Sequence, residues 1–191
     1  MTTATKITFA RLALVPVFAA FAIAYSLSVT SSQPAEIWRY LAMATFITAA
    51  LGDGLDGYIA RKFNQRSKLG AFMDPLADKT LLLTGVVVLT FFPWGRDEWN
   101  IPLWFLAIIV GRDIIMIAGI SVLKILNGYV PMSPHWVGKV CTVTQMFLLA
   151  WVMLKIIPIS PIYPALLAAF FTLVSGVIYV KMGIQMRPKA K

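Results

Sequence analysis

Six apolar stretches run through the chain, separated by short polar segments. They cover residues 9–29, 37–60, 69–93, 101–126, 136–157 and 160–184. Each is near or above the roughly 20 residues that a helix needs to cross the hydrocarbon core of a membrane. The separators, such as Ser31–Pro34 and Pro158–Pro161, have the composition of turns. The pattern predicts an all-α polytopic membrane protein with six transmembrane helices in one bundle, a single domain over 1–191.

The composition supports this prediction. Of the 191 residues, 59% are hydrophobic and 13% are charged, whereas a soluble domain averages roughly 45–50% apolar and about 25% charged residues. The single cysteine, Cys141, excludes an intramolecular disulfide and is expected to be a small packing residue.

The net charge of +9 is concentrated at the ends of the apolar segments. If the N-terminus is cytoplasmic, most Lys and Arg residues fall on the cytoplasmic side, and only Arg39, Arg96 and Lys155 fall on the other. The positive-inside rule therefore predicts cytoplasmic N- and C-termini. The same distribution favours contact with anionic lipids over nucleic acid, for which the chain has no recognisable motif.

Four aspartates lie within or at the ends of the second and third apolar stretches: Asp53, Asp56, Asp74 and Asp78. An ionised carboxylate is costly in a membrane and usually lines an aqueous or ion-filled site. At about 100° per residue, each pair shares one helix face. Because a short basic loop joins the two helices, we expect the four carboxylates to converge on one site near the cytoplasmic rim.

Carboxylate ligands suit hard divalent cations, Mg²⁺ first, with Mn²⁺ or Ca²⁺ also possible. Two ions spaced about 3.5–4 Å apart are the usual arrangement for displacement at phosphorus. Gly57, Ala60 and Arg61 share the face of the first aspartate pair, so a phosphate group could approach the helix and meet a guanidinium. The alternative is that the aspartates form structural ion pairs or the pathway of a divalent-cation or proton-coupled transporter.

The aspartate segment resembles the signature of the CDP-alcohol phosphatidyltransferase family and matches each of its fixed positions: Asp53, Asp56, Gly57, Ala60, Arg61, Gly70, Asp74 and Asp78. The resemblance in size and segment number covers essentially the whole chain. It implies an enzyme that transfers the phosphatidyl group of a CDP-linked lipid to an alcohol hydroxyl and releases CMP. It also implies a homodimer in the cytoplasmic membrane of a bacterium, with the active site facing the cytoplasm.

The resemblance further implies roles for individual residues. Asp53, Asp56 and Asp74 would bind the metal ions, and Asp78 would lie at the second ion and act as general base. Gly57, Arg61 and Ser67 would hold the CDP moiety, with Ala60 and Gly70 leaving it room. The N-terminal segment resembles the family's Asn-x-x-Thr-x-x-Arg sequence, with Thr5 in place of Asn, which adds Thr8 to the CDP-lipid site.

Arg112 and Lys139, with Arg11 as a further candidate, are expected to form a cationic pocket that binds an acceptor phosphate, such as that of glycerol 3-phosphate. The alternative for Arg112 is an ion pair with a nearby aspartate.

The stretch 136–145 is similar to the Gly-Lys-x-Lys-Thr-x-x-Gln pattern of phosphatidylglycerophosphate synthases, although Cys141 stands at their second lysine and Asp113 at their usual glutamate. These two departures and the segment 64–70 resemble the CMP-forming cardiolipin synthases, whose acceptor is phosphatidylglycerol. We expect phosphatidylglycerophosphate synthesis first, cardiolipin synthesis second and an inositol-phosphate acceptor third.

Overall fold

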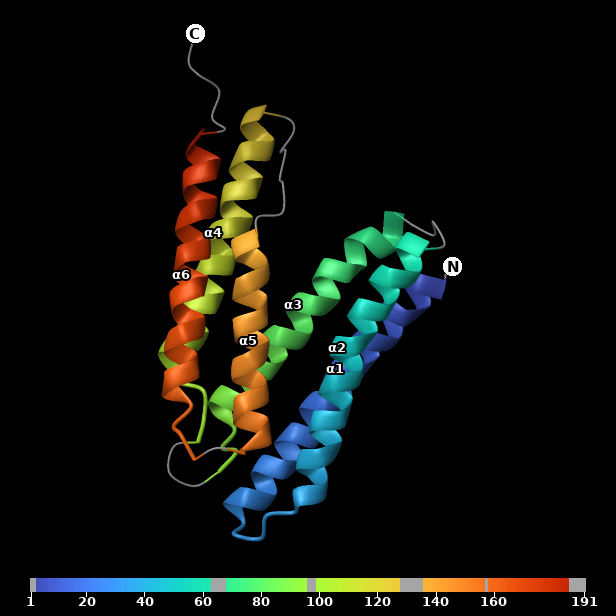
Figure 1. The fold of residues 1–191 in the computed structure, drawn as a ribbon, viewed down its shortest axis with the longest axis vertical. Helices are drawn as coiled ribbons and strands as arrows, with labels where there is room; N and C mark the ends of the chain where they lie inside the picture. The colour runs from blue at the N-terminus through green and yellow to red at the C-terminus, as the bar shows by residue number, and fades with distance from the viewer. Residues whose placement is uncertain (1–2, 63–67, 96–98, 128–135, 157, 186–191) are drawn as a thin grey trace. The chain divides into compact units, whose positions relative to one another are not determined.

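The computed structural model describes the backbone of residues 3–62, 68–95, 99–127, 136–156 and 158–185. Within these ranges, the side chains of residues 3–6, 53–62, 68–76, 124, 126 and 127 are outside the described set. The described residues form six α-helices and no strand (Figure 1). The helices are α1 (Thr3–Thr30), α2 (Glu36–Lys62), α3 (Lys68–Phe91), α4 (Leu103–Asn127), α5 (Trp136–Leu154) and α6 (Ile162–Gln185).

The six helices confirm the six segments predicted from the hydrophobic pattern, with differences of a few residues at their ends. The clearest difference is at α5, which ends at Leu154, whereas the apolar stretch runs to residue 157. Lys155 has a φ of 51°, in the left-handed region where a helix commonly ends. Ser160 caps the start of the next helix, because its hydroxyl accepts a hydrogen bond from the backbone N–H of Ile162 at 3.4 Å.

Four of the helices are long and apolar enough to cross a membrane: Ile7–Thr30 in α1, Leu103–Leu123 in α4, Trp136–Leu154 in α5 and Ile162–Gln185 in α6. The prediction of an integral membrane protein is therefore confirmed at the level of composition and length. In α2 and α3 the described side chains cover only 36–52 and 77–91, less than a span requires. Six spans with cytoplasmic termini remain a prediction.

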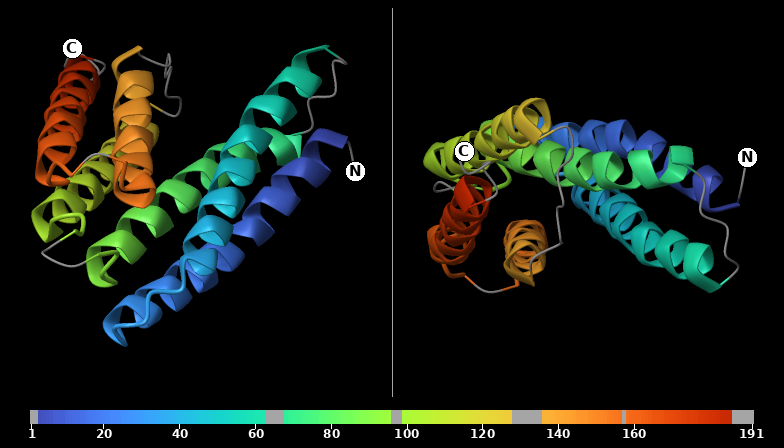
Figure 2. Two further views of the ribbon diagram at one scale, coloured as in Figure 1. Left: turned by 60° about the horizontal axis from the view of Figure 1, so that its bottom comes forward. Right: turned by 90° about the horizontal axis from the view of Figure 1, so that it is seen from above.

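The chain divides into two compact units. The first contains α1, α2 and α3 together with Val152–Ile156. Within it, α1 packs along both α2 and α3 (Figures 1 and 2). Phe18 of α1 meets Phe46 of α2 with ring centroids 5.4 Å apart, and Phe18 is fully buried. The first helix is thus the common packing partner in this unit.

A polar cluster lies at the end of this unit where α1 leads into α2. The Tyr25 hydroxyl donates a hydrogen bond to Glu36 at 3.2 Å, and Lys155 donates to the Tyr25 hydroxyl oxygen at 2.9 Å. Arg39 forms an ion pair with Glu36 at 2.8 Å. Burial, followed by the like charge of Arg39, lowers the pKa of Lys155 from its ordinary value of 10.5, while Glu36 raises it. The cluster attaches the residue after α5 to the α1–α2 hairpin.

The second unit contains α4, α6 and α5 as far as Trp151. Helices α4 and α6 pack against each other. Leu148, Leu149, Ala165 and Ala168 are fully buried and form part of its core. The small residues of α6 allow its neighbours to approach closely, as is common between helices in membranes.

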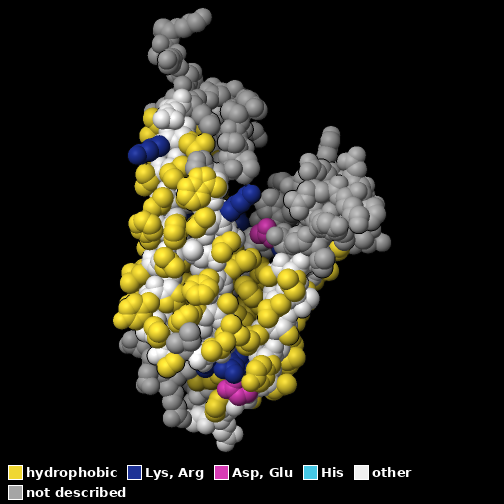
Figure 3. Space-filling view, viewed as in Figure 1, with side chains coloured by type: hydrophobic (Ala, Val, Ile, Leu, Met, Phe, Trp, Pro, Cys, Tyr) yellow, Lys and Arg dark blue, Asp and Glu magenta, His cyan; other side chains and the backbone are white. Residues whose placement is uncertain are grey.

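Large apolar side chains are exposed on both units, among them Leu27, Leu51, Ile114, Ile125 and Phe170. In the space-filling view, hydrophobic side chains cover most of the visible described surface (Figure 3). A soluble monomer rarely exposes so much contiguous apolar surface. The described surface therefore suits contact with lipid chains.

Candidate active site

The four aspartates are carried by two helices of the first unit. Asp53 and Asp56 belong to α2, and Asp74 and Asp78 belong to α3. The helical backbone confirms that the predicted spacing falls on helices, which places each pair on one face. The side chains of Asp53, Asp56 and Asp74 lie outside the described residues, so their predicted convergence remains a prediction.

Most side chains of the predicted CDP-lipid site also lie outside the described residues. Gly57, Ala60, Arg61 and Gly70 have a described helical backbone but no described side-chain environment, and Ser67 lies outside the described residues altogether. Thr8 is described, one helical turn before Arg11, and is 1% exposed. Its predicted contact with the CDP-lipid is not tested.

Asp78 forms an ion pair with Arg11 of α1. Arg11 Nη2 donates to Asp78 Oδ1, and Arg11 Nε donates to the carbonyl oxygen of Ala49 in α2 at 2.9 Å. The Arg11 side chain is 4% exposed, and that of Asp78 is 35% exposed. One buried guanidinium thus connects the first three helices, and it contacts the predicted base. Both residues were predicted as site residues, but their pairing was not.

Gly52 provides the space that Arg11 occupies. A Cβ placed on Gly52 would lie 2.9 Å from both Cγ and Cδ of Arg11. Because the far end of Arg11 is held by Ala49 and Asp78, the middle of the side chain has little freedom to move aside. Gly52 precedes the aspartate pattern by one residue, and the pattern gave no reason to select it.

The donor chemistry of this region fits a hard divalent cation. Carboxylates are the ligands that Mg²⁺ and Mn²⁺ prefer, and the one described carboxylate of the four, Asp78, keeps about a third of its side chain accessible. Among the residues with described side chains, no group of three or more His, Cys, Asp or Glu could hold a metal ion. The three remaining aspartates are not in that set.

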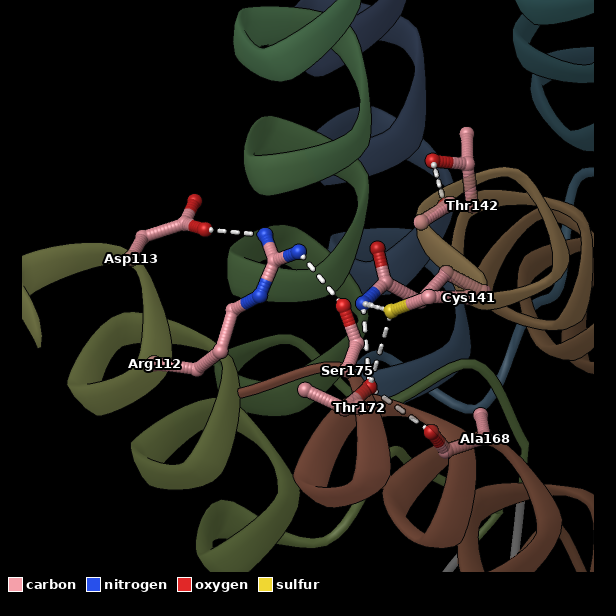
Figure 4. Close-up of polar contacts among 9 residues, drawn as sticks. Arg112, Asp113, Cys141, Thr142, Ala168, Thr172 and Ser175 are labelled. Carbon is pink, nitrogen blue, oxygen red and sulfur yellow. Dashed lines mark hydrogen bonds and ion pairs between the residues drawn. The ribbon is translucent and has the colours of Figure 1, made fainter. Parts of the chain in front are cut away.

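Arg112 lies in the second unit and contacts both its own helix and α6 (Figure 4). Its Nη1 donates to Asp113 Oδ1 at 2.8 Å, and its Nη2 donates to Ser175 Oγ at 2.9 Å. Its Nε is buried with no hydrogen-bond partner in the described part of the chain. The ion pair with a nearby aspartate, one of the two alternatives for Arg112, is therefore present, and it leaves one donor of the guanidinium unmatched.

Tyr179 lies against Arg112 and against the start of α5. The Arg112 Cζ atom is 5.6 Å from the centroid of the Tyr179 ring. A Cβ placed on Gly138 would lie 3.1 Å from the Tyr179 hydroxyl oxygen. Lys139 follows Gly138 on α5 and is exposed. Tyr179 thus lies between Arg112 and the turn of α5 that carries Lys139. The third predicted acceptor residue, Arg11, belongs to the first unit.

Cys141 belongs to a buried polar cluster between α5 and α6 (Figure 4). Gln145 Nε2 lies 3.2 Å from the Thr172 hydroxyl oxygen and 3.3 Å from Cys141 Sγ. The Cys141 and Thr172 side chains are 3.3 Å apart, and Cys141 is 2% exposed. The prediction of a packing role for Cys141 is confirmed, with the addition that the thiol has polar partners.

Sequence reasoning missed Ser175 and Tyr179. A signal was present, because the two polar residues are four apart in a mostly apolar segment and therefore share one face of a helix. That face meets Arg112, 63 residues earlier in the chain, which no local pattern could indicate.

Comparison with known proteins identifies the family. The family model described as CDP-alcohol phosphatidyltransferase matches residues 1–180. The chain is 34% identical over 149 residues to proteins named CDP-diacylglycerol--glycerol-3-phosphate 3-phosphatidyltransferase from Escherichia coli (strain K12), Shigella flexneri serotype 5b (strain 8401) and Shigella sonnei (strain Ss046). Each match covers 78% of this chain and 75% of the relative. The resemblance seen in the aspartate segment is thereby confirmed, and the chain belongs to the CDP-alcohol phosphatidyltransferase family.

Proposed function

We propose that this enzyme transfers the phosphatidyl group of CDP-diacylglycerol to a hydroxyl of glycerol 3-phosphate and releases CMP, forming phosphatidylglycerophosphate. The observation that carries the proposal is the 34% identity, over 149 residues, to relatives named for these two substrates. The matched part is most of either chain. The complete aspartate pattern supports the family's reaction, and the surroundings of Arg112 support a phosphate-bearing acceptor.

The reaction requires displacement at phosphorus. The acceptor hydroxyl oxygen forms a bond to the phosphorus of the phosphatidyl group, and the bond from that phosphorus to the bridging oxygen of the diphosphate breaks. The electron pair of this bond leaves with CMP. Asp78 accepts the proton of the attacking hydroxyl, for which its carboxylate must come within hydrogen-bond reach. Arg11, which donates to Asp78 Oδ1, orients this carboxylate.

Members of the family depend on a divalent cation. We assign two Mg²⁺ ions, with Mn²⁺ as a substitute, to Asp53, Asp56, Asp74 and Asp78. Bound there, the ions would offset the charge of the diphosphate and polarise its phosphorus. Gly57, Arg61 and Ser67 would hold the CDP moiety, with Ala60 and Gly70 leaving it room. Thr8 would belong to the same site. The four carboxylates repel one another without cations, so chelation should stop turnover.

Arg112 and Lys139 would bind the acceptor phosphate, whereas Arg11 of the first unit holds Ala49 and Asp78. Arginine suits this role because its planar guanidinium presents several donors to phosphate oxygens. The Arg112 side chain is 14% exposed, and within the described part of the chain its Nε has no hydrogen-bond partner. The ion pair with Asp113 would hold the guanidinium in place before the acceptor arrives.

The enzyme would reside in the cytoplasmic membrane of a bacterium with six spans and cytoplasmic termini, as the distribution of Lys and Arg favours. The active site would face the cytoplasm, and the diacylglycerol chains would remain in the bilayer. A homodimer is expected from the family.

The test uses the purified full-length protein in detergent micelles with Mg²⁺ and CDP-diacylglycerol. Glycerol 3-phosphate, phosphatidylglycerol and inositol phosphate are supplied separately, and CMP release and the lipid product are measured. Production of phosphatidylglycerophosphate from glycerol 3-phosphate alone supports the proposal. Removal of divalent cations with EDTA should stop CMP release, and added Mg²⁺ should restore it. Failure to use glycerol 3-phosphate under any of these conditions refutes the acceptor assignment.

Cardiolipin synthesis from phosphatidylglycerol is the second candidate, favoured by Cys141 and Asp113. Cys141 stands where phosphatidylglycerophosphate synthases have a second lysine, and it is buried against Thr172. This position therefore adds no positive charge to that of Arg112. A less positive pocket would suit an acceptor that carries less negative charge. Cardiolipin formation in the same assay would establish this alternative. A divalent-cation or proton-coupled transporter is disfavoured by family membership, and absence of Mg²⁺ flux in proteoliposomes would exclude Mg²⁺ transport.

A further inference from the structure

Three polar residues line one face of α6, and two of them contact Arg112. Thr172, Ser175 and Tyr179 are separated by three and four positions, so they lie in a row along the helix. Thr172 and Ser175 are fully buried. Thr172 meets Gln145 of α5, whereas Ser175 meets Arg112 of α4. This face of α6 is therefore a polar seam between two helices.

The seam fixes Arg112 along most of its length. The Cγ atom of Arg112 lies beside α6, since a Cβ on Gly176 would be 3.5 Å from it. One terminal nitrogen is held by the Ser175 hydroxyl at 2.9 Å, and the guanidinium lies over the Tyr179 ring at 5.6 Å. A side chain of this kind has many rotamers when unrestrained, so these contacts restrict where the positive charge is found.

We infer that Ser175 and Tyr179 are positioning residues that fix the Arg112 guanidinium for recognition of a phosphate-bearing acceptor. The inference rests on the proposed function, which gives Arg112 the acceptor phosphate. It adds two residues of α6 that lie outside the aspartate pattern and outside the predicted acceptor pocket. A Cβ on Gly138 would lie 3.1 Å from the Tyr179 hydroxyl oxygen, so Tyr179 lies between Arg112 and the turn of α5 that bears Lys139.

A positioning role predicts a selective effect on the acceptor. Replacement of a hydroxyl that holds a charged group typically weakens the arrangement it supports by about tenfold or more. Ser175→Ala and Tyr179→Leu should therefore raise the KM for glycerol 3-phosphate by about tenfold. The KM for CDP-diacylglycerol and the thermal unfolding temperature should stay near wild type. Ser175→Thr retains the hydroxyl and Tyr179→Phe retains the ring, so both should recover most of the acceptor affinity.

A matched control is available on α4. The Ser121 hydroxyl donates to the Ile117 carbonyl oxygen of its own helix at 2.9 Å and is exposed. Ser121→Ala removes the same atom without touching Arg112, and all kinetic constants should remain at wild-type values.

A double-mutant cycle shows whether Ser175 acts through Arg112. Arg112→Lys keeps the charge but loses the planar fork of donors. If Ser175 works by holding that fork, Ser175→Ala should raise the acceptor KM about tenfold in wild type and less than about twofold in the Arg112→Lys background.

The outcomes separate the inference from the proposed function. If Arg112→Lys raises the acceptor KM and Ser175→Ala and Tyr179→Leu do not, the positioning role is wrong and the proposed function stands. If Arg112→Lys leaves the acceptor KM unchanged, the assignment of Arg112 to the acceptor fails first. A rise in both substrate KM values together with a lower unfolding temperature, not recovered by Ser175→Thr, shows a structural role only and overturns the inference.

Discussion

Gly52 of α2 and Arg11 of α1 are packed so closely that a single added carbon would force them apart. The Cβ of an alanine at position 52 would lie 2.9 Å from two carbons of the arginine side chain. Arg11 extends past this point to Ala49 and to the predicted base Asp78. The position of the base therefore depends on a residue that carries no functional group.

The first prediction concerns this contact. Gly52→Ala should displace Arg11, disturb the orientation of Asp78 and lower kcat/KM by about tenfold or more, since small displacements of catalytic groups have large effects on rate. The measurement is CMP release at saturating Mg²⁺. Gly119→Ala in α4 is the matched control, because a Cβ at that position meets nothing within 4 Å. Equal activity of both variants would show that Arg11 adapts freely.

The second prediction concerns the base. Asp78→Asn keeps an oxygen that can accept from Arg11, so the packing of α1 against α3 should survive. Proton acceptance is lost, and general base catalysis contributes typically 10²–10⁴-fold. We expect turnover to fall by at least about a hundredfold, while binding of CDP-diacylglycerol is retained in part. Turnover close to wild type would remove Asp78 from the base role.

The third prediction concerns pH and Lys155. Burial and Arg39 lower its pKa in the folded protein, against the smaller opposite effect of Glu36. Between that lowered pKa and the ordinary value of 10.5, the unfolded chain holds more protons at this lysine than the folded protein. Stability from this group therefore increases as pH rises through that window.

Lys155→Met tests this effect, because it keeps an apolar stem and removes the titrating amine. The unfolding temperature of wild type relative to Lys155→Met should increase from neutral pH toward 10.5, by a small amount because the side chain is only partly buried. Lys181→Met, at an exposed lysine of α6, serves as control. A difference that stays constant or falls with pH would contradict the prediction.

The fourth prediction concerns the polar cluster between α5 and α6. Gln145→Leu removes the donor to Thr172 and Cys141. The bond to Thr172 joins α5 and α6, and interhelical hydrogen bonds in membrane proteins contribute about 0.6 kcal/mol on average and up to about 1.7 kcal/mol. We expect the unfolding temperature to fall by roughly 2–4 °C per kcal/mol lost.

Thr142→Val is the control for that measurement. The Thr142 hydroxyl donates to the Gly138 carbonyl oxygen of its own helix, so its loss leaves the pairing of α5 and α6 intact. If both variants unfold at the same temperature, Gln145 does not hold the two helices together.

The helices could be predicted from the sequence because their hydrophobic pattern is local. The six apolar stretches gave six helices, and the turn residues between them gave most of the helix ends. The end of α5 was predicted three residues too late, since Ile156 and Ile157 are as apolar as the helix before them. The left-handed backbone of Lys155 and its bond to Tyr25 decide the end, and both depend on tertiary contacts.

The candidate site was predictable in its residue types but not in its pairings. Asp78 and Arg11 were both identified, for different roles, and their ion pair joins positions 67 residues apart. Arg112 was correctly given two alternatives, of which the aspartate pair is present. Ser175 and Tyr179 were not selected because their importance comes from Arg112, on another helix. Spacing shows which residues share a face of one helix, whereas a contact with another helix requires the fold.

The bond between Arg11 and Asp78 has a consequence for biosynthesis. Because synthesis runs from the N-terminus, the first helix is complete before residue 78 is made, so the guanidinium at first lacks this partner. Until the third helix follows, a charge near the helix end is accommodated by extending toward water and lipid phosphates at the interface. We therefore expect the first helix to complete its packing only when the third is available, so that the two helices assemble in a coupled step.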